Sequence, residues 1–527
     1  MAKFGKPSFV SSDVFWQLMD LPRRHDDGLI QVTGKILATV LCLIASYYTI
    51  GTIYDLFFSP LKNVPGPSLA RVTRWWEYFM VKRGVSNLEY VDLHKKYGPV
   101  VRVGPNRYSI SLPSGVKTIY ELGGKYSKSD YYRPLQVADI EQQNIFSLQD
   151  NELHKERRRK VSSLYTMSSM VTYEKAVDEM NSVCIRKMQQ FAEQGRLVNI
   201  PQWMQYYAFD VIGEITFSKS FDMMENERDM SGMIPVIHSA NDSLAFYGII
   251  PNIVPWAKGL SAALGPLTGA LPVWNYAIQT ITETREANKE ATKKGDTMYQ
   301  TFLKKVLDLE AQGRVTMANI LDACGSNVAA GSDTTAISLS ACLYYLYTNR
   351  DKLQTLRKEI DTQAAAGRVS DPITFQEAQA LPYLQAVIKE VLRLHPAVGT
   401  ILPRVVPPGG LELSGYYFPP GTEVGVNAWV LHQNKDVYGP DPEIFRPERW
   451  IGEEKTGLME SMMFAFGGGS RTCLGRNISL LEITKVVPQI VRKFDVEFEH
   501  PGKPMESRCA WFVHPKYNGF FKLRAED

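Results

Sequence analysis

The sequence predicts a mainly α-helical domain with small β-sheets, preceded by a single N-terminal transmembrane helix. Three observations predict this fold class. Residues 36–54 are uncharged and mostly apolar, and about 20 such residues span a bilayer as a helix. Helical periodicity of apolar residues extends over residues 317–347 and 382–394. Short β-like runs punctuated by glycine and proline occur at residues 100–112 and 404–430.

The composition excludes several classes of protein. Of the 527 residues, 44% are hydrophobic and 22% are charged, which excludes a disordered, collagen-like or coiled-coil chain. The 59 Lys and Arg residues nearly balance the 56 Asp and Glu residues, so the net charge of +3 does not favour a nucleic-acid partner. The six cysteines are scattered without CxxC pairs, which favours a reducing compartment over a disulfide scaffold or a zinc module.

We divide the chain into an N-terminal segment (1–35), a transmembrane anchor (36–54), a proline-rich hinge (55–67) and a catalytic domain (68–527). The anchor stretch starts late and has no A-x-A cleavage site after it, which argues against a signal peptide and leaves a buried core helix as the alternative. Charge alone leaves the orientation of the anchor open, because acidic residues dilute the basic residues before it. Three prolines and one glycine at residues 60–67 break any helix in the hinge.

The catalytic domain begins with a predicted β-hairpin and a charged helical region. Residues 100–103 and 108–112 flank Gly104-Pro105-Asn106, which is typical of a hairpin turn. A helical, charged pattern extends from 152 to 187. The later helix that begins near Pro382 ends at His395, because a proline follows.

The most specific stretch is the glycine-rich loop Phe466–Gly475, which holds a single cysteine, Cys473. Glycines allow positive φ angles and a close approach of the backbone to a flat ligand. Amide N–H groups of such a loop can lower the pKa of the thiol, and a thiolate on haem iron favours O–O cleavage. Arg471 can pair with a haem propionate. A phosphate loop is excluded because no Gly-Lys-Ser/Thr follows, and an inert buried cysteine is the structural alternative.

The spacing Phe-Gly-x-Gly-x-Arg-x-Cys-x-Gly resembles the haem loop of the cytochrome P450 superfamily. In the family's order, Ala330–Thr335 resembles its oxygen-activation segment, Glu390–Arg393 its ExxR motif and Pro447–Trp450 its PERF motif. The resemblance covers essentially the whole chain, and the run after the loop is most similar to fungal members of the pisatin demethylase type. It implies the cytochrome P450 fold, with haem b bound through Cys473 as axial iron ligand. Further cofactor contacts are then expected from Phe466, Gly467 and Gly475.

Glu390 and Arg393 are three positions apart, so their side chains meet on one face of a helix. Apolar neighbours indicate that the pair is buried, where an unpaired charge is strongly destabilising. The resemblance adds Arg449 and implies a structural role, in which the three residues hold the segment before the glycine-rich loop. Without the resemblance to the family, a Glu/Arg pair on a helix is usually interpreted as a solvated surface pair.

Gly331, Ser332 and Thr334 are poor residues for the middle of a long helix. Ser and Thr hydroxyls can bond backward to carbonyls and bend the helix. At an opening over a haem, the Thr334 hydroxyl can hold a water network that donates protons to bound oxygen, and Asp333 can relay protons from outside. The alternative is a patch of small residues for helix packing.

The resemblance also predicts further partners of the haem propionates. Arg404 and His432 stand at positions where the family has such partners. Many members also carry a Trp-x-x-x-Arg pair; in this sequence His154 replaces the tryptophan, which leaves Arg158 as the expected partner. For His432 the alternative is a histidine satisfied near a strand end. The basic run 155–160 can dock an acidic reductase, or it can be an exposed charged face of a helix.

Together these features predict a membrane-anchored haem-thiolate monooxygenase that inserts one oxygen atom of O2 into a hydrophobic small molecule of fungal secondary metabolism. No flavin domain is visible in the sequence, so electrons are expected from NADPH through a separate cytochrome P450 reductase, with cytochrome b5 as a second candidate partner. The expected location is the endoplasmic reticulum membrane, with the catalytic domain in the cytosol. The alternatives are an oxygen-independent haem-thiolate isomerase or dehydratase, and a non-enzymatic haem sensor.

The expected substrate pocket is apolar and suits a molecule that partitions into membranes. Hydroxylation, demethylation and ring oxidation all fit this chemistry. By the layout of the resembled family, the pocket is lined by Phe246, Ala330, Gly331, Val398, Ile401 and Phe512.

Overall fold

The computed structural model describes residues 26–137, 139–264, 271–294, 301–452 and 456–525. Most of the predicted N-terminal segment, residues 1–25, lies outside these ranges. The chain divides into two compact units, Met1–Lys62 and Asn63–Asp527.

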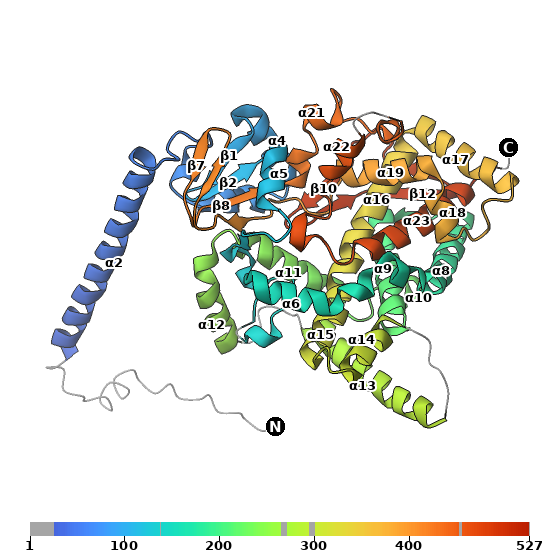
Figure 1. Ribbon diagram of the computed structural model, residues 1–527, viewed down its shortest axis with the longest axis horizontal. Helices are drawn as coiled ribbons and strands as arrows, with labels where there is room; N and C mark the ends of the chain where they lie inside the picture. Colours follow the sequence, from blue (N-terminus) through green and yellow to red (C-terminus); the bar gives the residue numbers. More distant parts are fainter. Residues whose placement is uncertain (1–25, 138, 265–270, 295–300, 453–455, 526–527) are drawn as a thin grey trace, which may run out of the picture. The chain divides into compact units, whose positions relative to one another are not determined.

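The first unit contains helix α2, Asp26–Phe57, which includes the predicted stretch 36–54 (Figure 1). Large apolar side chains on α2 are exposed, among them Ile36, Leu43 and Ile50. Within the part of the chain that the structure describes, no helix combines the length and the apolarity of a membrane span.

The end of the predicted hinge belongs to the second unit and lies against strand β1, Val100–Gly104. The N–H of Arg102 donates to the carbonyl of Pro65 at 2.8 Å. A Cβ on Gly66 would lie 2.4 Å from the carbonyl oxygen of Arg102, so only glycine fits at this position. The backbone path from residue 63 onward is therefore fixed by contact with the first strand.

The second unit is mainly helical, as predicted (Figure 1). Its first helices are α3 (Trp75–Lys82), α4 (Ser86–Tyr97), α5 (Pro113–Ile119), α6 (Asn151–Val161), α7 (Met167–Val171), α8 (Glu174–Glu193), α9 (Ile200–Phe217) and α10 (Met223–Asn226). Next come α11 (Met233–Tyr247), α12 (Val254–Leu264), α13 (Leu271–Lys294), α14 (Phe302–Ala311), α15 (Met317–Ser326) and α16 (Ser332–Thr348). The last helices are α17 (Arg350–Ala365), α18 (Phe375–Gln379), α19 (Pro382–Leu394), α20 (Ala428–Leu431), α21 (Lys435–Tyr438), α22 (Thr456–Ser461) and α23 (Arg476–Lys493).

The described strands form four small sheets. The largest sheet has the order β1-β2-β8-β5-β3, and the others are β4-β12-β9, β10-β11 and β6-β7. Only the pairing of β2 with β8 is parallel. The strands after β1 are β2 (Arg107–Ile110), β3 (Ser127–Lys128), β4 (Leu197–Asn199), β5 (Arg404–Val405), β6 (Leu411–Leu413), β7 (Tyr416–Phe418), β8 (Glu423–Val426), β9 (Phe494–Phe498), β10 (Glu506–Cys509), β11 (Val513–Lys516) and β12 (Asn518–Leu523).

Several predicted elements are confirmed and two are interrupted. β1 and β2 form the predicted antiparallel hairpin, and α19 begins at Pro382 and ends before His395 as predicted. The region predicted as one helical pattern over 152–187 is broken between α6 and α8, because a 3₁₀ turn and the short helix α7 intervene. The helix predicted over 317–347 is also interrupted, by a π-helical turn between α15 and α16.

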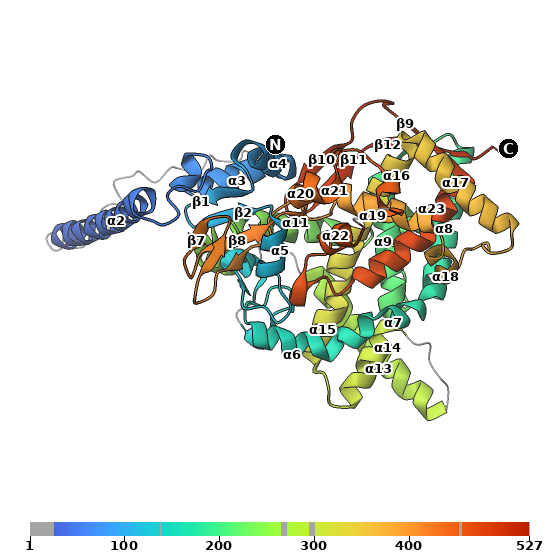
Figure 2. The same ribbon diagram turned by 45° about the horizontal axis from the view of Figure 1, so that its top comes forward.

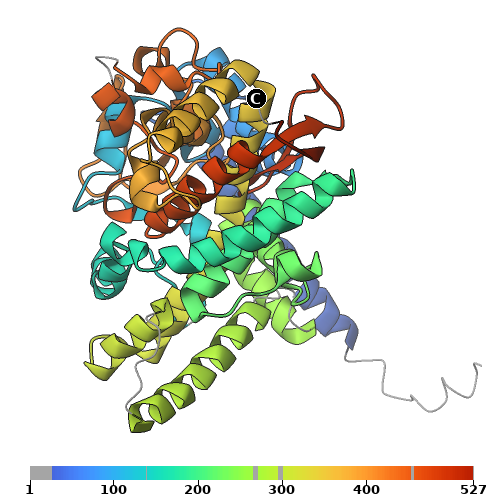
Figure 3. The same cartoon turned by 90° about the vertical axis from the view of Figure 1, so that its right-hand side faces the viewer.

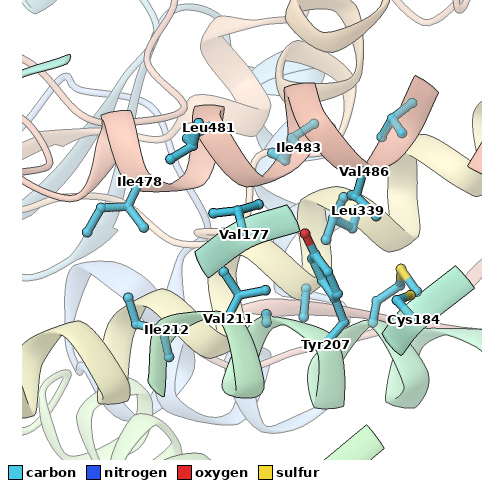
Figure 4. Close-up of a cluster of buried hydrophobic side chains, with 14 of the residues drawn as sticks. Val177, Cys184, Tyr207, Val211, Ile212, Leu339, Ile478, Leu481, Ile483 and Val486 are labelled. Carbon is cyan, nitrogen blue, oxygen red and sulfur yellow. The ribbon is translucent and has the colours of Figure 1, made fainter. Parts of the chain in front are cut away.

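The core of the second unit is built around α16, which packs against α9, α19 and α23. Nearly every residue of α9 is buried, because this helix lies between α16 and α8. Figure 4 shows side chains from four helices meeting there, including Val177 of α8, Val211 of α9, Leu339 of α16 and Ile483 of α23. The central helix is therefore held on several sides by apolar contacts.

The sheets lie on different sides of this helical core. In Figure 2 the sheet of β1, β2 and β8 lies beside α5, while α8, α17 and α23 gather at the opposite end of the second unit. Figure 3 shows the C-terminal strands, in red, next to α8, and β12 contacts that helix. Because α9 also packs against β11, the helical core contacts β-strands as well as other helices.

Candidate active site

The glycine-rich loop lies between α22 and α23 and is closed by its own backbone. The N–H of Cys473 donates to the carbonyl of Phe466 at 2.9 Å. Gly467 and Gly469 have φ angles of 70° and 62°, which favour glycine. A Cβ on Gly469 would lie 2.0 Å from the carbonyl oxygen of Tyr120. Glycine therefore allows the loop to lie directly against the segment that follows α5.

Cys473 is exposed to solvent, although many protein atoms surround its sulfur. This enclosure raises the pKa of Cys473, although the N–H groups of Gly475 and Arg476 donate to the sulfur and Arg158 lies near it. The loop amides do lower the pKa of Cys473 as predicted, but in the chain without haem the effect of burial is larger and raises it. Since a coordinating metal ion deprotonates a thiol outright, an accessible sulfur with two aligned amides fits a metal-bound thiolate.

Five basic side chains lie beside the loop, and we call them the cationic cluster: Lys128, His154, Arg158, Arg404 and Arg471. Four of them, all except Lys128, line a pocket of about 290 Å³. No carboxylate of the described residues lies within ion-pair distance of any member of the cluster.

The two arginines deepest in the cluster are held by neutral oxygens. Arg471 donates to the carbonyl of Leu148 at 2.6 Å and to Oδ1 of Asn151 at 2.8 Å. Arg404 is buried and donates to the carbonyl of Pro403 at 3.0 Å. These contacts position the guanidinium groups without neutralising their charge.

Lys128 and Arg158 complete the cluster in different ways. Lys128 donates to the carbonyl of Phe146, and its ammonium lies 4.1 Å from the centroid of the Tyr132 ring. The side chain of Arg158 makes no hydrogen bond or ion pair with any residue that the structure describes. Lys128 carries no motif in the sequence, so sequence reasoning missed it. Arg158, by contrast, was predicted, and its guanidinium has no partner among the described residues.

The cluster perturbs the protonation of its own members. Burial and the nearby Arg471 lower the pKa of His154 to about 3. Burial and the neighbouring Arg404 lower the pKa of Arg471 to about 10, and burial lowers the pKa of Lys128 well below its ordinary value. Carboxylates placed here would relieve the repulsion. One accessible thiol beside several uncompensated cations therefore fits a haem, which offers an axial metal position and two propionates.

His432 does not belong to the cationic cluster. It is fully buried; its Nδ1 donates to the carbonyl of Arg393 at 2.8 Å, and its Nε2 accepts from the N–H of Phe464 at 2.9 Å. Burial lowers the pKa of His432 to about 3, so the ring is neutral. Since both ring nitrogens are used, the prediction that His432 pairs with a propionate is corrected: it links the end of α19 to the start of the glycine-rich loop.

The centre of the long helix is distorted at the predicted place. A π-helical turn, Asn327–Gly331, separates α15 from α16. The hydroxyl of Thr334 donates to the carbonyl of Ala330 at 2.8 Å, and that of Ser332 donates to the carbonyl of Val328 at 2.6 Å. These are the backward bonds expected of Ser and Thr inside a helix. The Thr334 oxygen remains able to accept a hydrogen bond from water.

Asp333, the neighbour of Thr334, points into a polar cluster. Its Oδ1 accepts from Nε2 of Gln205 at 3.0 Å, and its Oδ2 accepts from Nδ2 of Asn241 at 3.4 Å. Nε2 of His238 lies 3.4 Å from Oδ1, and Nε2 of His514 lies 3.3 Å from Oδ2. Sequence reasoning missed these four residues, because they come from α9, α11 and β11 and share no motif.

The structure brings the predicted Glu390, Arg393 and Arg449 together, and we call them the Glu390 network. Arg393 donates to both carboxylate oxygens of Glu390, at 2.8 and 2.9 Å, and Nε of Arg449 donates to Oε1 at 3.0 Å. Trp450 donates to Oε2 at 2.9 Å. All three charged side chains are fully buried, so this is not a solvated surface pair.

The predicted pocket residues separate into two groups. One apolar cluster contains Phe246, Val398, Ile401 and Phe512. Ala330, on the π-helical turn, is exposed. A Cβ on Gly331 would lie 3.4 Å from Ile212 of α9, which is an ordinary van der Waals distance, so the packing of α9 does not itself require glycine at this position.

The basic run 155–160 does not form one exposed surface. Arg157 is buried and donates to two backbone carbonyls, and Arg158 belongs to the cationic cluster. Lys155 and Lys160 pair with glutamates of the same helix at 3.6 and 2.9 Å. The part of this run available to another protein is therefore smaller than the sequence suggests.

The comparisons with known proteins agree with this geometry. The family model named Cytochrome P450 matches residues 65–523. A pisatin demethylase from Fusarium vanettenii is 43% identical over 499 residues, covering 93% of this chain and 96% of its own length. The cytochrome P450 monooxygenase gsfF from Penicillium aethiopicum is 35% identical, covering 91% of this chain and 95% of its own length. The cytochrome P450 monooxygenase cicH from Emericella nidulans is 34% identical, with coverages of 89% and 94%.

The matched region contains the glycine-rich loop, the distorted central helix and the Glu390 network. Because family model and relatives extend over nearly the whole chain, the likeness is not confined to one motif. The chain therefore belongs to the cytochrome P450 family and is a haem-thiolate monooxygenase.

Proposed function

We propose that the protein oxidises a hydrophobic small molecule of secondary metabolism, using O2 and electrons that come from NADPH through a separate cytochrome P450 reductase, with cytochrome b5 as a second candidate partner. Demethylation is the reaction in the name of the pisatin demethylase quoted above, and hydroxylation is the simplest insertion of one oxygen atom. The observation that carries the proposal is the accessible Cys473 thiol beside a cationic cluster that no described carboxylate neutralises.

Haem, when bound, supplies the redox chemistry that activates O2. Cys473 would hold its iron, while Arg158, Arg404 and Arg471 would hold its propionates through charge-assisted hydrogen bonds. Gly467, with a φ angle of 70°, gives the loop a backbone turn that other residues rarely adopt, and Gly475 donates its N–H to the sulfur. The residues of the chain thus supply orientation and charge compensation.

Proton delivery is assigned to Asp333 and Thr334. Asp333 is almost fully buried, yet it contacts His238 and His514, whose side chains are 34% and 25% exposed. The carboxylate can therefore accept a proton from the solvent side and hold it within the helix. The Thr334 hydroxyl, fixed by its bond to Ala330, orients water on the neighbouring face.

The substrate proposal depends on the apolar cluster that contains Phe246, Val398, Ile401 and Phe512. Trp511 and Tyr131 also belong to this cluster, and their rings lie 5.8 Å apart. Aromatic and aliphatic side chains of this kind favour a hydrophobic molecule with few polar groups.

For the first unit we propose that residues 36–54 anchor the protein in the endoplasmic reticulum membrane, with residues 63–527 in the cytosol. The support is the uncharged sequence of this stretch within α2 and its exposed apolar side chains. In microsomes, the full chain should resist extraction with alkaline carbonate, and protease added without detergent should digest residues 63–527. Release by carbonate would contradict the anchor.

The reaction is tested by turnover under ¹⁸O2 with a fungal reductase. Hydrophobic compounds that shift the haem spectrum are selected first, and each product is expected to carry one ¹⁸O atom or to have lost a group through such an insertion. Product formed without reductase and O2 would instead indicate an isomerase or dehydratase. Spectral shifts without any product in the presence of both would indicate a sensor.

Proton delivery is tested with Asp333→Asn and Thr334→Ala. Each should lower the amount of product per NADPH consumed by ~10²-fold, the lower end of what a positioned proton donor contributes. Ser340→Ala removes another backward-bonded hydroxyl of α16 and should leave this ratio unchanged. Wild-type ratios in both test variants would contradict the assignment.

A further inference from the structure

Three side chains of metal-ligand type meet on one side of α16. They are His238 from α11, Asp333 from α16 and His514 from β11, and the ligand atoms that they offer all lie within 4.8 Å of one another. Nε2 of His238 faces one carboxylate oxygen at 3.4 Å, and Nε2 of His514 faces the other at 3.3 Å. The two imidazoles therefore approach one carboxylate from different sides.

These separations match those of ligands around a tetrahedral zinc ion. Zinc binds His nitrogen and carboxylate oxygen at about 2.0–2.2 Å, which places neighbouring ligand atoms about 3.3 Å apart. Two of the ligand pairs already have this spacing. The rings of His238 and His514 have centroids 4.6 Å apart in an edge-on arrangement, and their ligand nitrogens lie within 4.8 Å of each other.

The surroundings also have the form of a metal site. Asp333 is 2% exposed, and its orientation is set by hydrogen bonds from Gln205 and Asn241. Hydrogen bonds to a ligating carboxylate of this kind orient the ligands of metal sites. The Gln205 amide also lies 3.1 Å from Nε2 of His238, and an ion bound at that nitrogen would take the place of this contact. The partial exposure of both histidines leaves access for an ion and a water molecule.

We propose that His238, Asp333 and His514 form a binding site for a divalent transition-metal ion of the Zn²⁺ type, with water as the fourth ligand. Two imidazoles and one carboxylate suit Zn²⁺, whereas Mg²⁺ and Ca²⁺ take sets of oxygen ligands. The site is separate from the thiol of Cys473. A bound ion would occupy the carboxylate that we assign to proton delivery; this consequence rests on the proposed function, whereas the existence of the site does not.

The test is Zn²⁺ binding to the full-length, untagged, haem-loaded protein in its resting ferric state. After removal of bound metals, the protein is dialysed against micromolar ZnCl2 and the zinc content is measured. The wild type should bind one Zn²⁺ per chain saturably. The double variant His238→Gln/His514→Gln should bind it at least ~100-fold more weakly, since even the loss of outer contacts costs 10–100-fold. His500→Gln, which changes an exposed histidine outside the cluster, should bind like the wild type.

A second measurement uses the wild-type protein alone, so it does not depend on whether the double variant folds. X-ray absorption at the zinc edge of the wild-type protein should show only nitrogen and oxygen donors at about 2.0–2.2 Å, with the scattering pattern of two imidazoles. Sulfur donors, an all-oxygen shell, or undiminished zinc binding by a folded double variant would overturn the proposal. No turnover is involved, so failure here is distinguishable from failure of the proposed monooxygenase reaction.

Discussion

The Glu390 network and the cationic cluster are both buried and rich in arginine, but their charges are balanced differently. In the network, Glu390 accepts from Arg393 and Arg449 at 2.8–3.0 Å, and both guanidinium groups also donate to backbone carbonyls. In the cluster, five basic side chains meet without a carboxylate of the described residues in ion-pair distance. The charges of the network are balanced within the described residues, whereas the cluster has no such ion pair and would accept an anion.

Glu482 shows why this difference matters. Its two carboxylate oxygens are buried and have no hydrogen-bond partner among the described residues, and burial raises the pKa of Glu482 well above its ordinary value. A buried acid can therefore become neutral by taking up a proton. Arginine keeps its proton, so Arg158, Arg404 and Arg471 stay charged. A ligand that carries negative charge would therefore relieve the repulsion within the cluster.

The largest effect is expected when the complete network is broken. Glu390→Gln leaves Arg393 buried without a counter-charge and leaves Arg449 with only Asp441, at 3.6 Å, which should lower the free energy of unfolding by about 3–5 kcal/mol. Thermal unfolding and the yield of haem-loaded protein measure this effect.

The matched control for the network is Glu460→Gln, which breaks the half-exposed pair of Glu460 with Lys389. This change should cost no more than about 1 kcal/mol, because exposed ion pairs contribute little. Equal losses in the two variants would show that the buried network has no special role.

A smaller effect is expected from removing one cation of the cluster. Arg158→Gln should raise the haem dissociation constant about 10–100-fold, since a hydrogen bond to a charged group contributes about 1.5–3 kcal/mol. The haem-free variant should be at least as stable as the haem-free wild type, because the Arg158 side chain has no hydrogen-bond or ion-pair partner among the described residues and its charge is disfavoured by burial. Haem transfer to an acceptor protein measures the first quantity, and thermal unfolding without haem measures the second.

Lys160→Gln is the matched control, because Lys160 lies on the same helix and pairs with Glu156 at 2.9 Å. It should leave haem affinity unchanged. If Arg158→Gln also keeps wild-type haem affinity, Arg158 does not bind a propionate.

The smallest effect concerns pH. The pKa of His154 falls from 6.5 to about 3 on folding of the haem-free chain, so the unfolded chain binds more protons between these values. The resulting stability is present above pH 6.5 and is lost as pH falls toward 3. In haem-free His154→Gln, the loss of unfolding free energy between pH 6.5 and 5 should be ~1–2 kcal/mol smaller than in the wild type. Thermal unfolding at several pH values measures it, with His500→Gln as the control; equal slopes in wild type and His154→Gln would contradict the prediction.

Features that depend on spacing along one element were predictable from the sequence. Glu390 and Arg393 are three positions apart on one helix, so their side chains lie beside each other. The prolines at positions 382 and 396 mark the limits of α19. The glycine-rich loop was recognisable because its backbone requires glycine: at Gly469, a Cβ would lie only 2.0 Å from the carbonyl oxygen of Tyr120.

Features that depend on contacts between distant segments were not predictable. The role of His432 differs from the prediction because its two ring nitrogens meet backbone groups of Arg393 and Phe464, which no local pattern indicates. In the same way, Lys128 reaches the cluster through the pairing of β3 with β5. His514 reaches Asp333 because β11 packs near α16.

The central claim is that the Cys473 thiolate holds a haem iron, and the most direct measurement is the absorption spectrum of the reduced, CO-bound protein. We predict a strongly red-shifted Soret band for the wild type and for Cys342→Ala, which alters a buried cysteine elsewhere in the core. In Cys473→His the band should move to the position of a nitrogen-ligated haem. A red-shifted band that persists in Cys473→His would contradict the claim, as would its absence from haem-loaded wild-type protein.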